Sequence, residues 1–584
     1  MREYKTKRAR FEILRSQMDS ERSSFISHWR DIGDYVLPRR PRFTLSETNR
    51  GERKNQKIID STASLAARTL RSGMMGGITS PARPWFRLTS EDPNIAEQGA
   101  VKEWLSIVAD RMSNAFLRSN IYNALPIVYG DLGVFGTAAM LIDEDFTGDV
   151  IRAFPFPVGS YMIGNDDLGQ VRVFSRDFRM TVRQLLMKFG TKDENGKWVW
   201  DNFSDHVKFA YQSGHTESWV DVCHIIEPNE DSQEGALEPK YKKFTSCYFE
   251  RGTSGAGSGT YITSGKDDDR YLRESGYDYF PVLCPRWEVA DGDVYGTDCP
   301  GMVALGDIKQ LQLGEKRAAM AIEKMINPPM VGPNSLKNMK ASILPGDITF
   351  SDEASGKGMF RPAHEINFRL DALEGKQAQV RERVRRAFFE DLFLMLANSD
   401  RRQITAREIE ERHQEKLLAL GPVLEQLNQD LLDPLIDITF DIMMKQGLIP
   451  EPPEEIQGNE LKVEYVSFLA QAQKSLDVGG LERFASTVGQ MAQSTQDPTV
   501  LDKIDADQWV DEYADRLGVP PSVVRPDDEV AEIRAQRAEA QQAQAMAASA
   551  KEVTGAVKDL SETDMSKDSA LKALIERANV GSLV

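Results

Sequence analysis

The segment that most constrains the fold is the apolar stripe of residues 417–442. Leucine or isoleucine recurs there at steps of three and four residues, which places these side chains on one face of a helix: Leu417, Leu420, Leu424, Leu427, Leu431, Leu435, Ile438 and Ile442. The helical pattern runs from Thr405 to Gln446, about 60 Å at about 1.5 Å per residue. Since Leu418, Leu432 and Ile436 add a second apolar face, we expect a helix that crosses a core.

Two helix-breaking residues, Gly421 and Pro422, interrupt this stripe, and Pro434 follows. Proline lacks a backbone donor and clashes with the preceding turn, and glycine lowers the cost of altered dihedral angles. The pair predicts a kink at a fixed place, with a second, milder bend at Pro434. The alternative is a break between two or three ordinary helices.

Before this helix, two more helical patterns surround a segment without one. Residues 303–327 and 370–394 carry apolar positions at helical spacing, and Pro328-Pro329 ends the first. The intervening residues 328–369 contain only strand-like fragments. We therefore expect a hairpin of two helices with a small β-rich insertion at its tip, followed by a polar break at 395–404.

The remaining chain is mixed. Helical patterns cover residues 1–36, 58–77 and 97–141, whereas residues 150–289 show short alternating runs separated by turn residues, with a Gly/Ser-rich loop at 252–265. Helical fragments return at 502–518 and 529–553, and the second is either a helix packed by oligomer neighbours or a frayed tail. The fold class expected is α+β, with several subdomains in 584 residues.

The charge balance bears on nucleic-acid partners. The chain carries a formal net charge of −18, which weighs against a broad basic surface that neutralises phosphates. Sequence-specific DNA binding is therefore disfavoured, although a wall past which DNA slides is compatible with repulsion. No signal peptide and no apolar run of about 18 residues occurs, so we expect no membrane. Four cysteines without CxxC spacing suggest reduced thiols.

Motifs for catalysis are missing. The Gly-Lys pairs lack the partner glycine of a phosphate-binding loop, and neither GxSxG nor HExxH occurs. Cys223 and His224 are adjacent, so on a strand their side chains face opposite ways. We therefore expect no metal site, no cofactor and no enzymatic activity.

Three long stretches, residues 58–88, 405–453 and 463–474, the last followed by a segment such as LDKIDADQWVDEYADRLG, resemble the head-to-tail connecting, or portal, proteins of short-tailed bacteriophages. The resemblance implies a ring of twelve subunits, a dodecamer, at one capsid vertex of the virion, assembled in the host cytoplasm. Double-stranded genomic DNA passes through its channel without sequence specificity during packaging and ejection. The implied protein partners are terminase, the major capsid or scaffolding protein and tail adaptor proteins.

The resemblance also implies a portal fold with a mostly helical wing, a helical-hairpin stem, a small β-rich clip and a helical C-terminal crown. These parts correspond to residues 1–302 (wing), 303–327 and 370–394 (stem), 328–369 (clip), 395–404 (tunnel loop), 405–474 (kinked helix and wing return) and 475–584 (crown).

Candidate DNA contacts follow from that assignment. Arg401 and Arg402 lie in the expected tunnel loop, where they either touch phosphates or are solvated or helix-capping. Lys309, Lys316 and Lys324, with Arg317, recur on the first stem helix, where intersubunit ion pairing is the alternative. Two other classes remain open: a nucleic-acid packaging enzyme, disfavoured by the missing phosphate loop, and a helical scaffolding protein, disfavoured by the β-rich region.

Overall fold

The computed structural model describes residues 7–45, 51–52, 54–90, 92, 95, 98–146, 148–233, 235–251, 270–290, 292–326, 330–331, 361–362, 370–398, 420–456, 461–466, 483–491, 505–517, 524–525, 530–544 and 546. The chain divides into two compact units. The first comprises Met1–Leu88, Ile107–Glu451 and Val463–Thr487, and the second Thr89–Ser106, Pro452–Lys462 and Val488–Val584. Helices and sheets are mixed throughout the first unit, which confirms the expected α+β class.

Two antiparallel sheets are formed by strands that lie, except for β2, in the region 150–289 in which strands were predicted. The larger has the order β4-β5-β6-β7-β8, with β4 Tyr161–Asn165, β5 Val171–Thr181, β6 Trp219–Pro228, β7 Phe244–Glu250 and β8 Arg273–Tyr277. The smaller has the order β3-β2-β9, with β2 Met140–Asp145, β3 Val150–Pro155 and β9 Val282–Leu283. Each strand of the larger sheet pairs with the next one in sequence, so the sheet is a meander.

Helices cover both faces of the larger sheet. Phe11 of α1 (Lys7–Tyr35) packs with Cys223 and Phe249 on one face. On the other face α6 (Val182–Phe189) and α7 (Asp205–Gln212) build an apolar cluster that includes Val222. Cys223 and His224 lie on opposite faces, as alternation along a strand requires.

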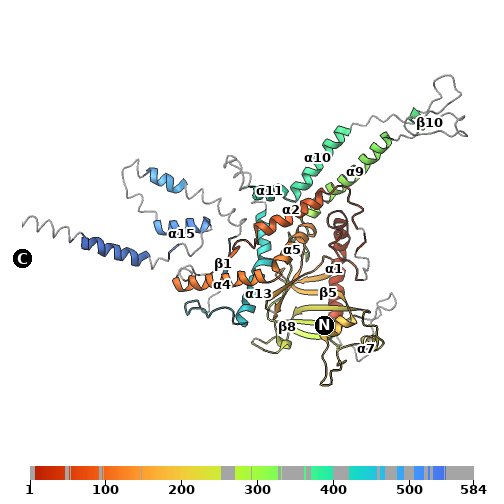
Figure 1. Ribbon diagram of the computed structural model, residues 1–584, viewed down its shortest axis with the longest axis horizontal. Helices are drawn as coiled ribbons and strands as arrows, with labels where there is room; N and C mark the ends of the chain where they lie inside the picture. Colours follow the sequence, from red (N-terminus) through yellow and green to blue (C-terminus); the bar gives the residue numbers. More distant parts are fainter. Residues whose placement is uncertain are drawn as a thin grey trace, which may run out of the picture. The chain divides into compact units, whose positions relative to one another are not determined.

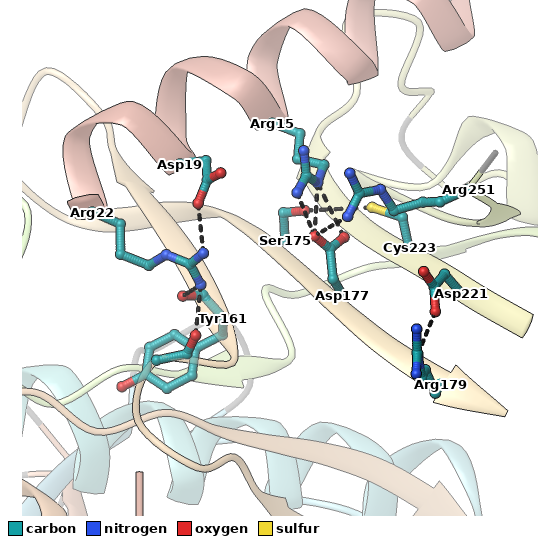
Figure 2. Close-up of polar contacts among 11 residues, drawn as sticks. Arg15, Asp19, Arg22, Tyr161, Ser175, Asp177, Arg179, Asp221, Cys223 and Arg251 are labelled. Atoms are coloured by element: carbon teal, nitrogen blue, oxygen red, sulfur yellow. Dashed lines mark hydrogen bonds and ion pairs between the residues drawn. The ribbon is translucent and has the colours of Figure 1, made fainter. Parts of the chain in front are cut away.

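Arginines tie α1 to the sheet (Figure 2). The Arg15 Nε lies 3.0 and 2.9 Å from the two carboxylate oxygens of Asp177, and Arg251 Nη1 donates to the same carboxylate at 2.7 Å. Arg22 Nη1 donates to the carbonyls of Gly159 and Tyr161 at 2.7 and 3.2 Å. These buried charges therefore have partners, which is the condition under which burial of a charge is tolerated.

Among the other helices, α2 (Thr62–Gly77) packs on α5 (Ile121–Phe135), which also contacts α8 (Pro300–Val303). The helix α4 (Gly99–Arg118) has residues in both units. A short η1 (Pro239–Tyr241) precedes β7. Gly136 ends α5 in the left-handed region with φ 76°, which glycine adopts without strain. The helical pattern predicted for 97–141 thus gives way to β2 at Met140.

The predicted hairpin is present. Its helices are α9 (Leu305–Ile326) and α10 (Leu370–Ala387), and the strands β10 (Met330–Val331) and β11 (Arg361–Pro362) pair antiparallel beyond them. Figure 1 shows α9 and α10 side by side in green, with their β10 end pointing away from the sheets. The rest of the predicted insertion and the Gly/Ser-rich loop lie outside the described residues.

After α11 (Glu390–Asn398), the chain is described again from Leu420, and residues 420–427 are helical. A π-helical turn, η4 (Asn428–Leu432), and α13 (Asp433–Lys445) follow. The remaining strands are β1 (Phe86–Ser90) and β12 (Leu461–Tyr465). In the second unit, α15 (Ala506–Leu517) and helical residues 530–544 are joined by Arg534, which donates two 2.6 Å hydrogen bonds to the Asp507 carboxylate.

Candidate functional site: the helical hairpin

The two ends of the hairpin differ in burial. Near its base, α9 buries Leu305, Ile308 and Leu311, and α10 buries Val380 and Val384. Further along, α9 exposes a series of apolar side chains: Leu313, Met320, Ile322, Met325 and Ile326, which are 43–79% exposed. Single exposed apolar residues are ordinary, so what distinguishes α9 is that several of its apolar side chains are left uncovered by the described part of the chain.

Polar contacts fix the base of the hairpin to the start of α2. The Gln312 Oε1 accepts hydrogen bonds from the backbone N–H groups of Ile59 and Asp60 at 2.7 and 2.9 Å. Arg381 of α10 reaches the Asp60 carboxylate at 2.8 Å and Glu315 of α9 at 2.5 Å. Burial opposes ionisation of Asp60, yet hydrogen bonds from Thr62 and Arg381 lower its pKa. Three segments distant in sequence therefore meet at Asp60, α9 through the backbone N–H of that residue and α10 through its carboxylate.

The arginines at the C-terminal end of α10 all have acidic partners. Arg383 donates to both oxygens of Asp307 on α9, at 3.0 and 2.7 Å. Arg385 lies 3.5 Å from Glu390, and Arg386 lies 3.1 Å from Glu382 one turn earlier. The basic charge of this helix end is thus balanced within the subunit.

The predicted DNA contacts on α9 fall into two groups. The Lys309 Nζ forms an ion pair with Asp31 of α1 and lies 5.8 Å from the ring centre of Tyr35, so its charge is already engaged. Lys316, Arg317 and Lys324 are exposed, and none of them forms an ion pair within the described part of the chain. Arg401 and Arg402 lie outside the described residues. DNA contact by these side chains stays a prediction.

The second hairpin helix was expected to be continuous over 370–394, and this expectation is wrong. α10 ends at Ala387 and α11 begins at Glu390, with Phe389 between them at φ 54°. A non-glycine residue in the left-handed region is strained, so its surroundings must hold it there. Phe388 is fully buried, Phe389 lies 6.2 Å from the Trp287 ring, and Phe393 fills the space beside Gly73. The break lets all three phenyl rings reach the core.

From Leu420 onward the apolar stripe of the long helix is buried, as the spacing predicts, except at Leu424, which is half-buried. The kink predicted at Gly421 and Pro422 involves residues before 420, which lie outside the described part, so it stays a prediction. An irregularity that the pattern did not predict is the π-helical turn. Its position just before Pro434 has a physical cause, because proline cannot donate to the carbonyl four residues earlier and the wider turn absorbs that loss.

Beside the π-helical turn lies a cavity of about 1150 Å³ with an acidic wall. Asp433, Asp437 and Asp441 of α13 line it, and Arg286 of its wall lies 3.1 Å from Asp430. Burial, then the neighbouring Asp433 and Asp441, raise the pKa of Asp437 to about 6. Within the ranges that the structure describes, no group of three ligating side chains is arranged to hold a metal ion.

The sequence analysis expected reduced cysteine thiols and no membrane. All four cysteines are buried free thiols, and burial raises the pKa of Cys299 to about 12, so these groups pack as apolar side chains. Among the helices of the described residues, none is long and apolar enough to span a bilayer.

Comparison with known proteins places the chain in a family. The family described as "Bacteriophage head to tail connecting protein" matches residues 8–524. The "Portal protein" of Salmonella phage epsilon15 is 46% identical over 564 residues, 96% of this chain and 97% of the relative. The "Probable portal protein" of Bordetella phage BPP-1 is 43% identical over 555 residues, 95% of each chain. The chain therefore belongs to the family of bacteriophage head-to-tail connecting proteins.

Proposed function

We propose that this protein is a portal, the structural connector through which viral DNA enters and leaves the capsid. The similarity to two phage portal proteins over nearly the whole chain carries the proposal. It occupies one vertex of the virion, with assembly in the host cytoplasm. The neighbouring components are the capsid or scaffolding protein on one side and terminase, then tail adaptor proteins, on the other.

The hairpin supports a ring of subunits, with twelve as the proposed number. Side chains from Leu313 to Ile326 leave apolar surface exposed on a single chain, and a second hairpin set beside the first would cover it. A repeated head-to-tail contact closes into a ring when its rotation permits. In this assignment α9 and α10 are stem helices, 328–369 is the clip and 475–584 is the crown.

The channel is proposed to guide DNA without holding it. Each subunit contributes a net charge of −18, so the assembled ring repels a polyanion and few basic residues touch it. We assign point contacts with phosphates to Arg401, Arg402, Lys316 and Lys324. Lys309 is a weaker candidate because of its ion pair with Asp31.

Electron microscopy of the purified protein tests the ring. End-on views with an open centre and about twelvefold symmetry are expected from the proposed assembly. In Met320→Glu the apolar surface gains a charge, and we expect loss of rings with retention of the subunit fold by circular dichroism. Gln212→Glu, which adds a charge at an exposed position at the end of α7, is the control and should still assemble. Rings of normal yield from Met320→Glu would contradict the assigned interface.

The DNA contacts need a different assay. Arg401→Ala with Arg402→Ala should leave rings intact and reduce packaging or retention of DNA, because only point contacts are removed. Failure of ring assembly in this variant would show instead that the two arginines are structural. ATP hydrolysis by the isolated protein would favour the packaging-enzyme alternative.

A further inference from the structure

A row of polar side chains crosses the larger sheet on the face opposite α1. Arg176 of β5 pairs in register with His224 of β6, His224 with Tyr248 of β7, and Tyr248 with Arg273 of β8. Directly opposed residues on antiparallel strands project from the same face. Four neighbouring strands thus bring two arginines, a histidine and a tyrosine together.

Arg176 is a largely enclosed cation without a carboxylate. Its guanidinium carbon lies 4.5 Å from the ring centres of both Phe156 and Phe178. Its hydrogen-bonding neighbour is Tyr248, its Nε is shielded from solvent without a partner, and no described carboxylate is within ion-pair distance. Burial lowers its pKa. A charge in such surroundings destabilises the fold unless a counterion arrives.

Lys188 and Arg273 are two further cations close to Tyr248. The Lys188 Nζ of α6 lies 5.3 Å from the Tyr248 ring centre, and both Lys188 and Arg273 are exposed. His224 is fully buried and stacks 3.8 Å from Tyr248, with Nε2 bonded to the Ser246 hydroxyl at 3.0 Å.

The charges around this histidine are unbalanced. Burial, then Arg176, Lys188 and Arg273, lower the pKa of His224, which is therefore neutral. Its Nδ1 is enclosed without a partner. The carboxylate that interacts with Lys188 and Arg273 is Asp143 of β2. Three cations thus meet one carboxylate, in a chain whose overall charge is strongly negative.

We propose that Arg176, Lys188 and Arg273 form a binding site for a single oxyanion, the group that a phosphate ion or a carboxylate side chain presents. The guanidinium of Arg176 is held between two rings, so its fork has a fixed direction, which suits a planar or tetrahedral oxyanion. Lys188 and Arg273 form the exposed rim. A recessed cation fits a small group better than a DNA duplex, whose phosphates are contacted by exposed side chains.

The test measures thermal unfolding of the full-length protein in inorganic phosphate and in chloride of equal ionic strength. We expect phosphate to raise Tm to a saturating value, because an ion that binds the folded state stabilises it. The shift should vanish in Arg176→Met and weaken in Lys188→Gln. Arg179→Met is the matched control, since Arg179 lies on the same strand and pairs with Asp221 at 2.6 Å; it should keep the shift.

The source of the oxyanion is distinguished by the assembly state. A phosphate shift in both dispersed subunits and rings indicates a free ion, whereas a shift confined to dispersed subunits indicates that a neighbour's carboxylate fills the site in the ring. Equal unfolding in phosphate and chloride in both states, or an undiminished shift in Arg176→Met and Lys188→Gln, overturns the proposal. If Arg176→Met does not fold, the size of the phosphate-dependent Tm shift in Lys188→Gln tests the proposal.

Discussion

Both faces of the five-stranded sheet carry arginines, but the arginines on the two faces have different partners. On the α1 face, Asp177 accepts hydrogen bonds from Arg15 and Arg251 (Figure 2). On the other face, the adjacent Arg176 meets two aromatic rings and, among the described residues, no carboxylate. The first face is thus balanced within one chain and holds a helix in place, whereas the second leaves a cation for an added ligand. On β5, Asp177 therefore holds α1 in place, whereas the adjacent Arg176 belongs to the proposed binding site.

The largest expected effect comes from breaking the balanced face. Asp177→Ala leaves Arg15 and Arg251 without their shared carboxylate, and removing one partner of a buried ion pair costs about 3–5 kcal/mol. Urea unfolding of the full-length protein measures the loss. Asp221→Ala, which deprives only Arg179 of its partner, is the control with a smaller loss. Equal losses in the two variants would show that the shared carboxylate has no special role.

The unbalanced face should respond in the opposite direction. Arg176→Met replaces an uncompensated cation with an apolar chain of similar length, so the free energy of unfolding in chloride buffer should rise by about 1 kcal/mol or more. The same urea titration measures this gain. A marked loss of stability would indicate that the stacking on Phe156 and Phe178 outweighs the charge penalty.

The acidic wall of the cavity contains carboxylates, whereas the unbalanced sheet face contains cations. The folded-state pKa of Asp437 is raised to about 6, so the native state binds its proton more tightly than the unfolded chain. Stability from this group is therefore present at low pH and is lost as pH rises through about 6. Asp437→Asn should flatten that decline in a series of Tm measurements, and an unchanged pH profile would contradict the assignment.

The smallest effect is expected at the rim of the balanced face. Lys7 and Glu274 pair at 2.7 Å, and each side chain is 38% exposed. An exposed ion pair contributes about 0–1 kcal/mol. Lys7→Ala should accordingly change the urea midpoint little, and a loss near that of Asp177→Ala would mean that charge balance on this face extends to its edge.

Local sequence patterns predicted the helices and strands better than they predicted the contacts between them. Helical spacing located α9 and the buried stripe from Leu420, and alternation located the strands, because both signals lie within a few residues. The Arg15–Asp177 pair spans 162 positions, which no local pattern encodes. The break at Phe389 was also missed, since consecutive phenylalanines fit a helix until Trp287 and Gly73 determine where their rings lie. Neither the π-helical turn nor the row through Arg176 has a local signature.

The contacts at the base of the hairpin have a mechanical consequence. Gln312 and Arg381 bind the residues that lead into α2, and α2 lies against α5, where Leu70 occupies the space beside Gly133. A tilt of the hairpin therefore cannot stay local, because the start of α2 must follow it. We therefore expect a displacement of the hairpin to be transmitted through α2 to α5, which packs beside it.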